Sequence, residues 1–429
     1  MTDTAHSVLF DAARCNACVA CTKACPARAI RVRGGAVRVD RDLCIDCGEC
    51  IRACPRGAVR ARTSVPSDLG RFPWRIAVLS TTLFAQFGRD VRPDQVVAGL
   101  TKIGFNDWYD LSWMCEMVAG AVDTYLSECQ GPWPKLSVTC PAIVRLVQLR
   151  YPDLLQHLVP IEAPRELAAR LVRRKAAHER GLRPDQIGVF YTTPCSAIMQ
   201  SIASPVGLDA SYLNGAFSIA ELYGPLLAAI REGGTPPAGH RSSPQGLGWA
   251  VAGGQSAMMR DRNTLTVSGL RDVIHVFDRI ESGKFEGVDF IEAYICPDGC
   301  VSGPLLVEGR YAARRTMQWI AHDAGTQGAV KEEKVRSMFR EHFFDLQDDI
   351  RARAARPRTT GLRQAVQRRQ EKTALVARLP GKDCGACGAP DCATLADDVL
   401  DGAAGLDDCV FLKLGGAVDA ARPPEEGVG

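Results

Sequence analysis

The chain has 429 residues, of which 46% are hydrophobic and 24% are charged, so wholesale disorder is excluded. Its 52 Lys and Arg residues nearly balance 49 Asp and Glu residues, and the net charge of +3 argues against a dedicated nucleic-acid-binding protein. The unusual feature is the content of 18 cysteines.

Features of export and membrane insertion are missing from the sequence. We find no run of the roughly 18 apolar residues that a membrane span needs, and residues 1–6 lack the basic and apolar regions of a signal peptide. We therefore expect a cytoplasmic protein, in which clustered cysteines usually bind metal. A secreted protein held together by disulfides is the alternative, which the chain length and the lack of an export signal disfavour.

Two cysteine runs near the N-terminus share the spacing C-x2-C-x2-C-x3-C-P and are offset by 29 residues. Bacterial ferredoxins with two [4Fe–4S] clusters have this spacing, and the fourth cysteine of each run ligates the other cluster. The pattern predicts an α+β ferredoxin-like domain over residues 1–63. It assigns cluster 1 to Cys15, Cys18, Cys21 and Cys54, and cluster 2 to Cys44, Cys47, Cys50 and Cys25. Zinc bound by four thiolates is the alternative.

The middle of the chain alternates predicted strands with helices, which predicts an α/β core with parallel sheets over residues 70–350. One helix is expected over residues 164–180, with Pro164 in its first turn and Gly181 at its end.

Three strands, at residues 135–139, 187–192 and 288–295, are each followed by cysteine. Because ligands bind at the carboxyl ends of parallel strands, we expect one central [4Fe–4S] site. Its ligands would be Cys140, Cys195, Cys296 and Cys300. Four buried packing cysteines are the alternative.

Other features of the core carry no cofactor. Cys115 and Cys129 are interpreted as packing residues, because the other sixteen cysteines form four complete sets. The glycine-rich segment 246–254 has Val251 where a dinucleotide loop needs glycine. We therefore predict no NAD or flavin site.

Residues 351–378 hold nine Lys or Arg residues and one acid, Glu371. This segment is expected to be a solvated basic linker or helix. It could alternatively bind nucleic acid or an acidic partner such as a ferredoxin.

Four further cysteines lie near the C-terminus, with glycines beside them that let backbone pass close to a cluster. They are Cys384, Cys387, Cys392 and Cys409. They predict a small α-rich [4Fe–4S] domain over residues 379–415, and a structural zinc site is the alternative.

The three cysteine-bearing loops of the core resemble the active-site loops of iron-only hydrogenases, as Thr139-Cys140-Pro141, Thr193-Pro194-Cys195 and 296–300 show. The resemblance covers nearly the whole chain and is strongest to the sensory branch, which has a ferredoxin domain before the core and a cluster domain after it. It implies that the four central cysteines hold a [4Fe–4S] cube, with Cys300 bridging to a diiron subsite that carries carbonyl and cyanide ligands.

This sequence departs from the family at the residues that support the diiron subsite. Thr139 takes the place of the proton-relay cysteine, and Ile198 takes the place of a lysine that hydrogen-bonds a cyanide. Loss of that charge-assisted bond costs about 1.5–3 kcal/mol. Thr193 and Tyr294 replace methionines, and Asp298 in the third loop is expected to add like-charge repulsion if it is buried and unpaired.

Two functions follow as expectations. The first is an iron–sulfur oxidoreductase whose terminal clusters relay electrons to the central site, where hydrogen and protons interconvert slowly or hydrogen or redox state is sensed. The second is a non-catalytic electron carrier or redox sensor without the diiron subsite. The sixteen cysteines in four sets predict four [4Fe–4S] clusters, and a redox partner such as ferredoxin is expected. The resemblance to the sensory branch implies a signalling partner.

Overall fold

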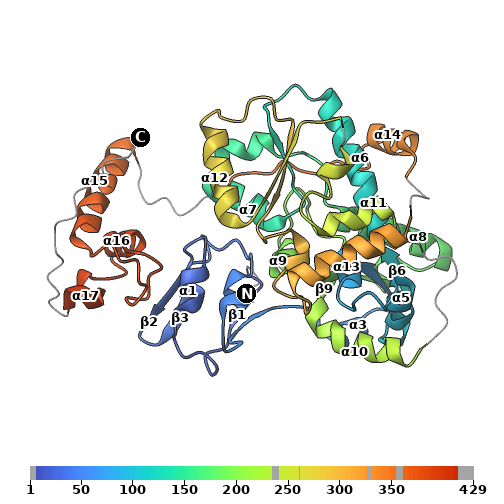
Figure 1. The fold of residues 1–429 in the computed structure, drawn as a ribbon, viewed down its shortest axis with the longest axis horizontal. Helices are drawn as coiled ribbons and strands as arrows, with labels where there is room; N and C mark the ends of the chain where they lie inside the picture. Colours follow the sequence, from blue (N-terminus) through green and yellow to red (C-terminus); the bar gives the residue numbers. More distant parts are fainter. Residues whose placement is uncertain (1–5, 234–240, 260, 326–329, 354–360, 414–429) are drawn as a thin grey trace. The chain divides into compact units, whose positions relative to one another are not determined.

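The computed structural model describes residues 6–233, 241–259, 261–325, 330–353 and 361–413. These residues form two compact units (Figure 1). The first contains residues 6–9 and 45–48 and the described part of 61–353, and the second contains residues 10–44, 49–60 and 361–413. Residues 354–360 of the predicted basic linker and the predicted domain end at 415 lie outside the described residues.

The larger sheet of the first unit has four parallel strands in the order β6-β5-β8-β9. They are β5 (Trp74–Leu79), β6 (Asp107–Asp110), β8 (Ile187–Thr193) and β9 (Gly215–Ser218). Every residue of β8 is buried, as expected for a strand covered on both faces. This strand confirms the one predicted over residues 187–192.

A second parallel sheet has the order β10-β11-β7. Its strands are β7 (Lys135–Leu136), β10 (Thr264–Ser268) and β11 (Phe290–Tyr294). Two of the three cysteine-bearing strands, β7 and β11, are therefore neighbours, while β8 lies in the other sheet. The prediction of parallel sheets is confirmed, and the three cysteine-bearing strands are divided between two sheets. The strand predicted over 135–139 is also shorter, because its chain turns toward helix α7 after Leu136.

Helices cover both faces of the four-stranded sheet (Figure 1). Ile76 and Val78 of β5 pack with α6 and α8 in one apolar cluster, whereas Ala77 and Leu79 pack with α5, α10 and α13 in another. Such alternation is what a strand buried on both sides requires.

The helices of the first unit have the following bounds: α3 (Pro66–Leu69), α4 (Thr81–Phe84), α5 (Pro93–Lys102), α6 (Ser112–Glu128), α7 (Pro141–Arg150), α8 (Pro164–Arg180), α9 (Ser196–Ala203), α10 (Ile219–Arg231), α11 (Pro244–Leu247), α12 (Leu270–Glu281), α13 (Arg310–Asp323) and α14 (Glu332–Arg340). The predicted helix 164–180 is confirmed, with Pro164 in its first turn and Gly181 at φ 62° as its C-cap. Among the described helices, none combines the length and the apolar character that crossing a bilayer requires.

The second unit combines ferredoxin-like segments with the C-terminal segment. Its strands and helices are β2 (Ile30–Arg33), β3 (Ala36–Val39), α1 (Ala20–Ala24), α2 (Glu49–Ala53), α15 (Leu362–Arg378), α16 (Cys392–Leu400) and α17 (Val410–Lys413). Strands β1 (Val8–Phe10) and β4 (Val59–Ala61) pair as a two-stranded ribbon. The part of the predicted linker from 362 onward is helix α15, which is held to α16 by the pairs Arg368–Asp401 and Lys372–Asp397, each 2.7 Å.

Candidate metal centres

The two N-terminal cysteine runs fold as a structural repeat with the 29-residue offset of the sequence. Helix α1 corresponds to α2, and the same offset relates three pairs of residues with positive φ. The pairs are Ala17 and Asp46, Val19 and Gly48, and Arg28 and Gly57. Residues other than glycine adopt this conformation at a cost of about 1–2 kcal/mol. Both loops therefore keep a strained backbone that aims amide groups toward the cysteine sulfurs.

The four predicted ligands of cluster 1 line one small cavity of about 20 Å³. They are Cys15, Cys18, Cys21 and Cys54, and the other walls come mainly from apolar residues, Val32 among them. The Ala58 N–H donates to Cys54 Sγ at 3.2 Å. Although burial acts to raise the pKa of the Cys54 thiol, backbone N–H groups lower it overall. Burial raises the pKa of the Cys21 thiol on the same cavity. Four cysteines around one cavity, with a backbone N–H bonded to a sulfur, fit an iron–sulfur cluster.

The predicted ligands of cluster 2 show the same local design. The Ala29 N–H donates to Cys25 Sγ at 3.3 Å, as Ala58 does to Cys54 in the other half of the repeat. Burial and the neighbouring thiols of Cys25 and Cys44 raise the pKa of Cys50. Cys25, Cys44 and Cys50 are therefore neighbours in the second unit. Cys47 belongs to the segment 45–48, which packs in the first unit.

The segment 45–48 is fixed in the first unit by a buried carboxylate, Asp46. Its oxygens accept hydrogen bonds from the Ser7 backbone N–H at 2.9 Å and from His6 Nδ1 at 2.8 Å, and they pair with Arg145 at 3.4 Å. The side chain of Asp46 is fully buried. Removing a buried charge from such a network is costly, so Asp46 determines where this loop lies.

The same segment contacts the residue after Cys195 and a proline four residues beyond Cys300. Ser196, which follows Cys195, donates its hydroxyl to the Asp46 carbonyl oxygen at 2.7 Å. At Gly48, a Cβ atom would lie 2.6 Å from Pro304 Cγ and 2.9 Å from Ser196 Oγ. Only glycine lets the backbone at position 48 come this close to Pro304 and Ser196. Glycine also readily adopts the φ of 80° found at this position.

The central cysteines come from three separate loops. Cys140 is the N-cap of α7 and Cys195 the N-cap of α9, whereas Cys296 and Cys300 follow β11, with Cys300 opening a short 3₁₀ turn. Helix N-termini favour negative charge, because their first N–H groups have no partner within the helix. Backbone N–H groups of Ala197 and Ile198 accordingly lower the pKa of the Cys195 thiol against the larger effect of burial, which raises it to about 11.

The structure brings these four thiols together in the interior of the first unit. Burial raises the pKa of Cys300 well above its ordinary value, and the neighbouring Cys195, Cys140 and Cys296 raise it further. Their mutual electrostatic effect requires that they lie close to one another. Burial thus raises the pKa values of the Cys140, Cys195 and Cys300 thiols. Such a group fits a multivalent metal centre, because metal binding would relieve both the burial of charge and the repulsion between thiolates.

A buried guanidinium lies beside this group and was missed by sequence reasoning. Arg165 is 8% exposed, lowers the pKa values of Cys140 and Cys195, and donates to Ser201 Oγ at 3.2 Å. Arginine is common on α8, so the sequence pattern alone does not separate this side chain from those that reach solvent. Its position supplies positive charge where the thiolates would be negative.

Residues at the positions that departed from the family pattern are uncharged and close to the centre. Ile198 lies in α9 and packs in the apolar core of the first unit, and the Thr139 carbonyl oxygen accepts a bond from Arg165 at 3.5 Å. The Thr193 hydroxyl bonds to the Cys195 backbone, and the Tyr294 hydroxyl donates to Glu292 at 2.9 Å. None of these four side chains supplies an ammonium or a thiol.

Asp298 does not act as the sequence suggested. Its side chain is 26% exposed and pairs with Arg314 at 3.3 Å and with Arg310 at 3.5 Å. The two guanidinium groups offset its charge, so the expected repulsion does not apply. Asp298 itself adopts a positive φ of 62° in this loop.

The C-terminal cysteines form a less enclosed group. Burial raises the pKa of Cys387, and the neighbouring Cys384 and Cys409 raise it further. Cys392 opens α16, and its N–H donates to Asp383 Oδ1 at 2.8 Å. The electrostatic neighbours of Cys387 thus include two of the other three predicted ligands, while Cys392 is tied to the same loop through Asp383.

The two remaining cysteines, Cys115 and Cys129, belong to none of the predicted ligand sets, although the Cys115 thiol also acts to raise the pKa of Cys300 and therefore lies near the central group. Cys115 is fully buried in the apolar core beside α8, and Cys129 donates weakly to the Leu126 carbonyl oxygen at 4.0 Å. Their interpretation as packing residues stays consistent with these contacts.

Comparisons with known proteins agree with the fold and with the kind of metal site. The family model "Iron only hydrogenase large subunit, C-terminal domain" matches residues 75–205 and 251–304, and the model "4Fe-4S dicluster domain" matches 7–55. A third model, "Putative Fe-S cluster", matches 379–411.

Relatives and solved structures come from the same group. Iron hydrogenase 1 of Clostridium pasteurianum is 26% identical over 114 residues, which are 26% of this chain and only 20% of that protein. Two variants of the [FeFe]-hydrogenase from Chlamydomonas reinhardtii match with TM-scores of 0.52 and 0.51 at 13% and 14% identity. Each match covers 68% of this chain and 98% or 97% of the other, and at this identity it shows the fold alone.

Proposed function

The chain fits an [FeFe]-hydrogenase-like family, and on this premise we propose that it is an iron–sulfur redox protein whose ferredoxin-type sites exchange electrons with a central [4Fe–4S] site. The observation that carries the proposal is the convergence of Cys140, Cys195, Cys296 and Cys300 in the buried core. A bound cluster would supply one-electron redox chemistry there.

The residues around the central cysteines support such a group. Two helix N-termini, at Cys140 and Cys195, direct backbone N–H groups at the sulfurs, and Arg165 adds a buried positive charge. Burial excludes water, and in a low-dielectric interior these groups act more strongly on an anionic centre. They would favour the more reduced, more negative state of the centre.

The contacts of the segment 45–48 support an electron path to this site. The segment carries Cys47, and Gly48 packs against residues next to Cys195 and near Cys300. Glycine at this position allows backbone to approach closely, and a short separation favours electron transfer. Cys47 is thus the proposed point at which electrons reach the central site.

Hydrogen chemistry is the finer part of the proposal. A diiron subsite bridged by Cys300 would let the centre interconvert hydrogen and protons slowly, or sense hydrogen. The second candidate is an electron carrier or redox sensor without that subsite. It is favoured by Ile198 and Thr139, because a buried hydrocarbon and a hydroxyl replace the cyanide-binding ammonium and the proton-relay thiol.

One experiment separates these possibilities. The protein is purified anaerobically, with and without co-expression of the hydrogenase maturation enzymes, and iron, paramagnetic signals and infrared spectra are measured. About sixteen irons per chain support four clusters, and about twelve would contradict the central site or the C-terminal site. Carbonyl and cyanide bands with dye-linked hydrogen oxidation support the enzyme, whereas their absence in a fully loaded protein supports the carrier.

The proposed external partner is an acidic one-electron carrier of the ferredoxin class. Helix α15 supports this, because it has no fully buried residue and carries Arg363, Arg369 and Arg378 in addition to the two basic residues that pair with α16, against the single acid Glu371. The rate of electron transfer from a reduced ferredoxin is expected to fall as salt rises from 50 to about 300 mM. A salt-independent rate would argue against a charged docking surface.

A further inference from the structure

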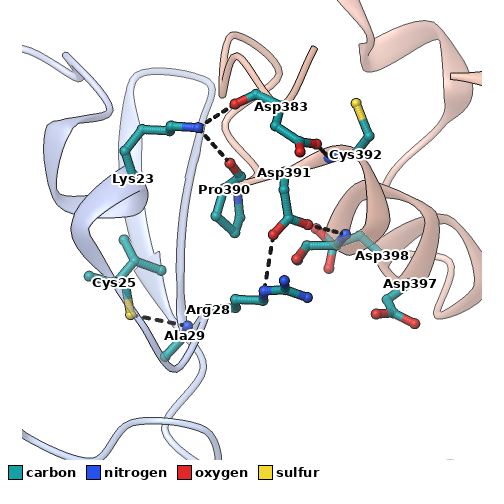
Figure 2. Close-up of polar contacts among 12 residues, drawn as sticks. Lys23, Cys25, Arg28, Ala29, Asp383, Pro390, Asp391, Cys392, Asp397 and Asp398 are labelled. Atoms are coloured by element: carbon teal, nitrogen blue, oxygen red, sulfur yellow. Dashed lines mark hydrogen bonds and ion pairs between the residues drawn. The ribbon is translucent and has the colours of Figure 1, made fainter. Parts of the chain in front are cut away.

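Within the second unit, the C-terminal segment contacts the ferredoxin-like segment through four basic side chains. Figure 2 shows this contact around Lys23 and Arg28. The four residues follow one another from helix α1 to the end of strand β2, and they are Lys23, Arg28, Arg31 and Arg33. Their acceptors are two carboxylates and three carbonyl oxygens of the C-terminal segment: Asp391, Asp398, and the carbonyls of Asp383, Pro390 and Ala403.

Asp398 is the centre of this contact. Arg31 binds it in bidentate fashion, with Nε–Oδ2 at 2.6 Å and Nη2–Oδ1 at 3.0 Å, and Arg33 contacts the same carboxylate at 2.5 Å. Arg31 and Arg33 are two residues apart on β2 and therefore share a face of the strand. The side chains of all three are no more than 20% exposed. A bidentate, partly buried pair of this kind fixes orientation as well as contact.

The backbones also join. The Val32 N–H donates to the Gly388 carbonyl oxygen at 3.0 Å, on the edge of β2 that does not pair with β3. A Cβ atom at Gly388 would lie 1.6 Å from the Val32 carbonyl oxygen, so no other residue fits without displacing the strand. The bond covers a strand edge that would otherwise offer unpaired groups to another chain.

This backbone contact links two predicted metal sites by a short route. Gly388 directly follows Cys387, and the Val32 side chain lines the cavity formed by the ligands of cluster 1. Lys23, two residues after Cys21, donates to the carbonyl oxygens of Asp383 and Pro390, of which Asp383 precedes Cys384. The Gly388–Val32 and Asp383–Lys23 contacts both begin at residues next to C-terminal cysteines. The first of them ends at the cluster 1 cavity.

We propose that the C-terminal metal-binding segment is docked on the ferredoxin-like segment as a permanent electron-exchange neighbour of the cluster 1 site. Arg31 and Arg33 are positioning residues for this pair of sites. One electron leaves one site and arrives at the other, with no bond formed or broken and no proton moved. The electron originates from an external one-electron carrier such as a reduced ferredoxin or a viologen. The inference rests on the proposed function, because it requires iron–sulfur clusters at both sites.

The test compares matched variants of the full chain, reconstituted with iron and sulfide under anaerobic conditions. Asp398→Ala removes the carboxylate that binds β2, whereas Asp397→Ala removes one that pairs with Lys372 of α15. Gly388→Ala introduces the clash with Val32, whereas Gly402→Ala places the same side chain at a similar φ of 67° with nothing within 4 Å. In each pair, the first variant disturbs the docking contact and the second is its control. Asp397→Ala controls for the loss of a negative charge, and Gly402→Ala controls for the loss of a glycine.

Two readouts are independent of enzymatic activity. Hydrogen exchange at the Val32 amide is expected to accelerate at least about tenfold in Asp398→Ala and Gly388→Ala, and to stay unchanged in both controls. In the reduced protein, the magnetic coupling between the C-terminal cluster and cluster 1 is expected to weaken in the same two variants.

The outcomes distinguish this inference from the proposed function. Full iron content with unchanged Val32 exchange and unchanged coupling in Asp398→Ala and Gly388→Ala would overturn the docking. Zinc at the C-terminal site of the unaltered protein would overturn the electron exchange. Loss of the central signal in the unaltered protein would instead contradict the proposed function, and the comparison of Val32 exchange rates would still decide whether the C-terminal segment is docked.

Discussion

Each N-terminal cysteine run spans 11 residues, from Cys15 to Cys25 and from Cys44 to Cys54, whereas the central cysteines span residues 140–300. In the first case, a short loop and one turn of helix bring most of the sulfurs together, and the 29-residue repeat recurs in the backbone conformation. In the second, two sheets and two helix N-termini must assemble first. Local sites tolerate changes elsewhere, while the central site depends on the packing of the whole core.

The largest effect is expected from a variant that tests whether the central site and the ferredoxin-type sites are independent. Cys300→Ser removes one predicted central ligand, and we expect loss of about four irons per chain with unchanged ferredoxin-type paramagnetic signals. Iron analysis and low-temperature paramagnetic resonance measure both quantities. Loss of the ferredoxin-type signals as well would show that the two regions are not independent.

The matched control for that variant is Cys115→Ala. Cys115 is fully buried beside α8 and is predicted to bind no metal. We expect unchanged iron content and a loss of about 1–2 kcal/mol in the free energy of unfolding, because a small cavity replaces the sulfur. A Cys300→Ser protein that retains all of its iron would contradict the predicted central site.

Asp46 tests how firmly the segment 45–48 belongs to the core unit. In Asp46→Ala, the buried Arg145 loses a carboxylate partner, and we expect the free energy of unfolding to fall by about 3–5 kcal/mol in urea denaturation. Asp123→Ala removes a more exposed partner of Arg262 and should cost less than about 1 kcal/mol. Equal losses in the two variants would mean that Asp46 does not anchor the loop.

Glu162 provides a pH test of the core. Burial raises its pKa from 4.5 to about 7, so the folded protein keeps this proton in a range where the unfolded chain loses it. The contribution of this proton to the free energy of unfolding is therefore complete below pH 4.5 and is lost as the pH rises through 7. The total loss is at most about 3 kcal/mol. Glu162→Gln should flatten this part of the stability profile, and Glu232→Gln, at an exposed position, should not. An unchanged profile in Glu162→Gln would contradict the raised pKa.

The smallest effect concerns the ferredoxin-like repeat. Ala17 adopts φ 57° in the loop of the first run, so Ala17→Gly should raise stability by about 0.5–1 kcal/mol, as measured by the temperature at which the cluster absorbance is lost. Ala24→Gly, at the end of helix α1, should lower it by a similar amount. Destabilisation by Ala17→Gly would show that the strained conformation is not what limits this loop.

Prediction from sequence succeeded where the pattern was local. The helix over 164–180 was marked at both ends, by Pro164 and Gly181, and the strand at 187–192 was rich in β-branched and aromatic residues. It failed at the strand predicted over 135–139, because only two of those residues pair in the sheet. The division of the three cysteine-bearing strands between two sheets could not be predicted for a similar reason, since pairing between distant strands leaves no local signal.

Side-chain environments were the other source of error. Asp298 carries a charge in a loop next to Cys300, and nothing nearby in the sequence indicated that Arg310 and Arg314 of α13 offset it. Asp46 and Arg165 were missed because charged residues usually face solvent. Their burial depends on elements brought together from far apart in the chain.

The sequence by itself determined that this protein carries sets of cysteines with iron–sulfur spacing and an α/β core, because such spacing and periodicity are properties of neighbouring residues. Only the tertiary structure decided that Cys140, Cys195, Cys296 and Cys300 meet, that Arg165 lies beside them and that Asp398 binds Arg31 and Arg33. Contacts between distant residues form only when the whole chain packs. The free energy that stabilises them therefore cannot be read from any short segment of the sequence.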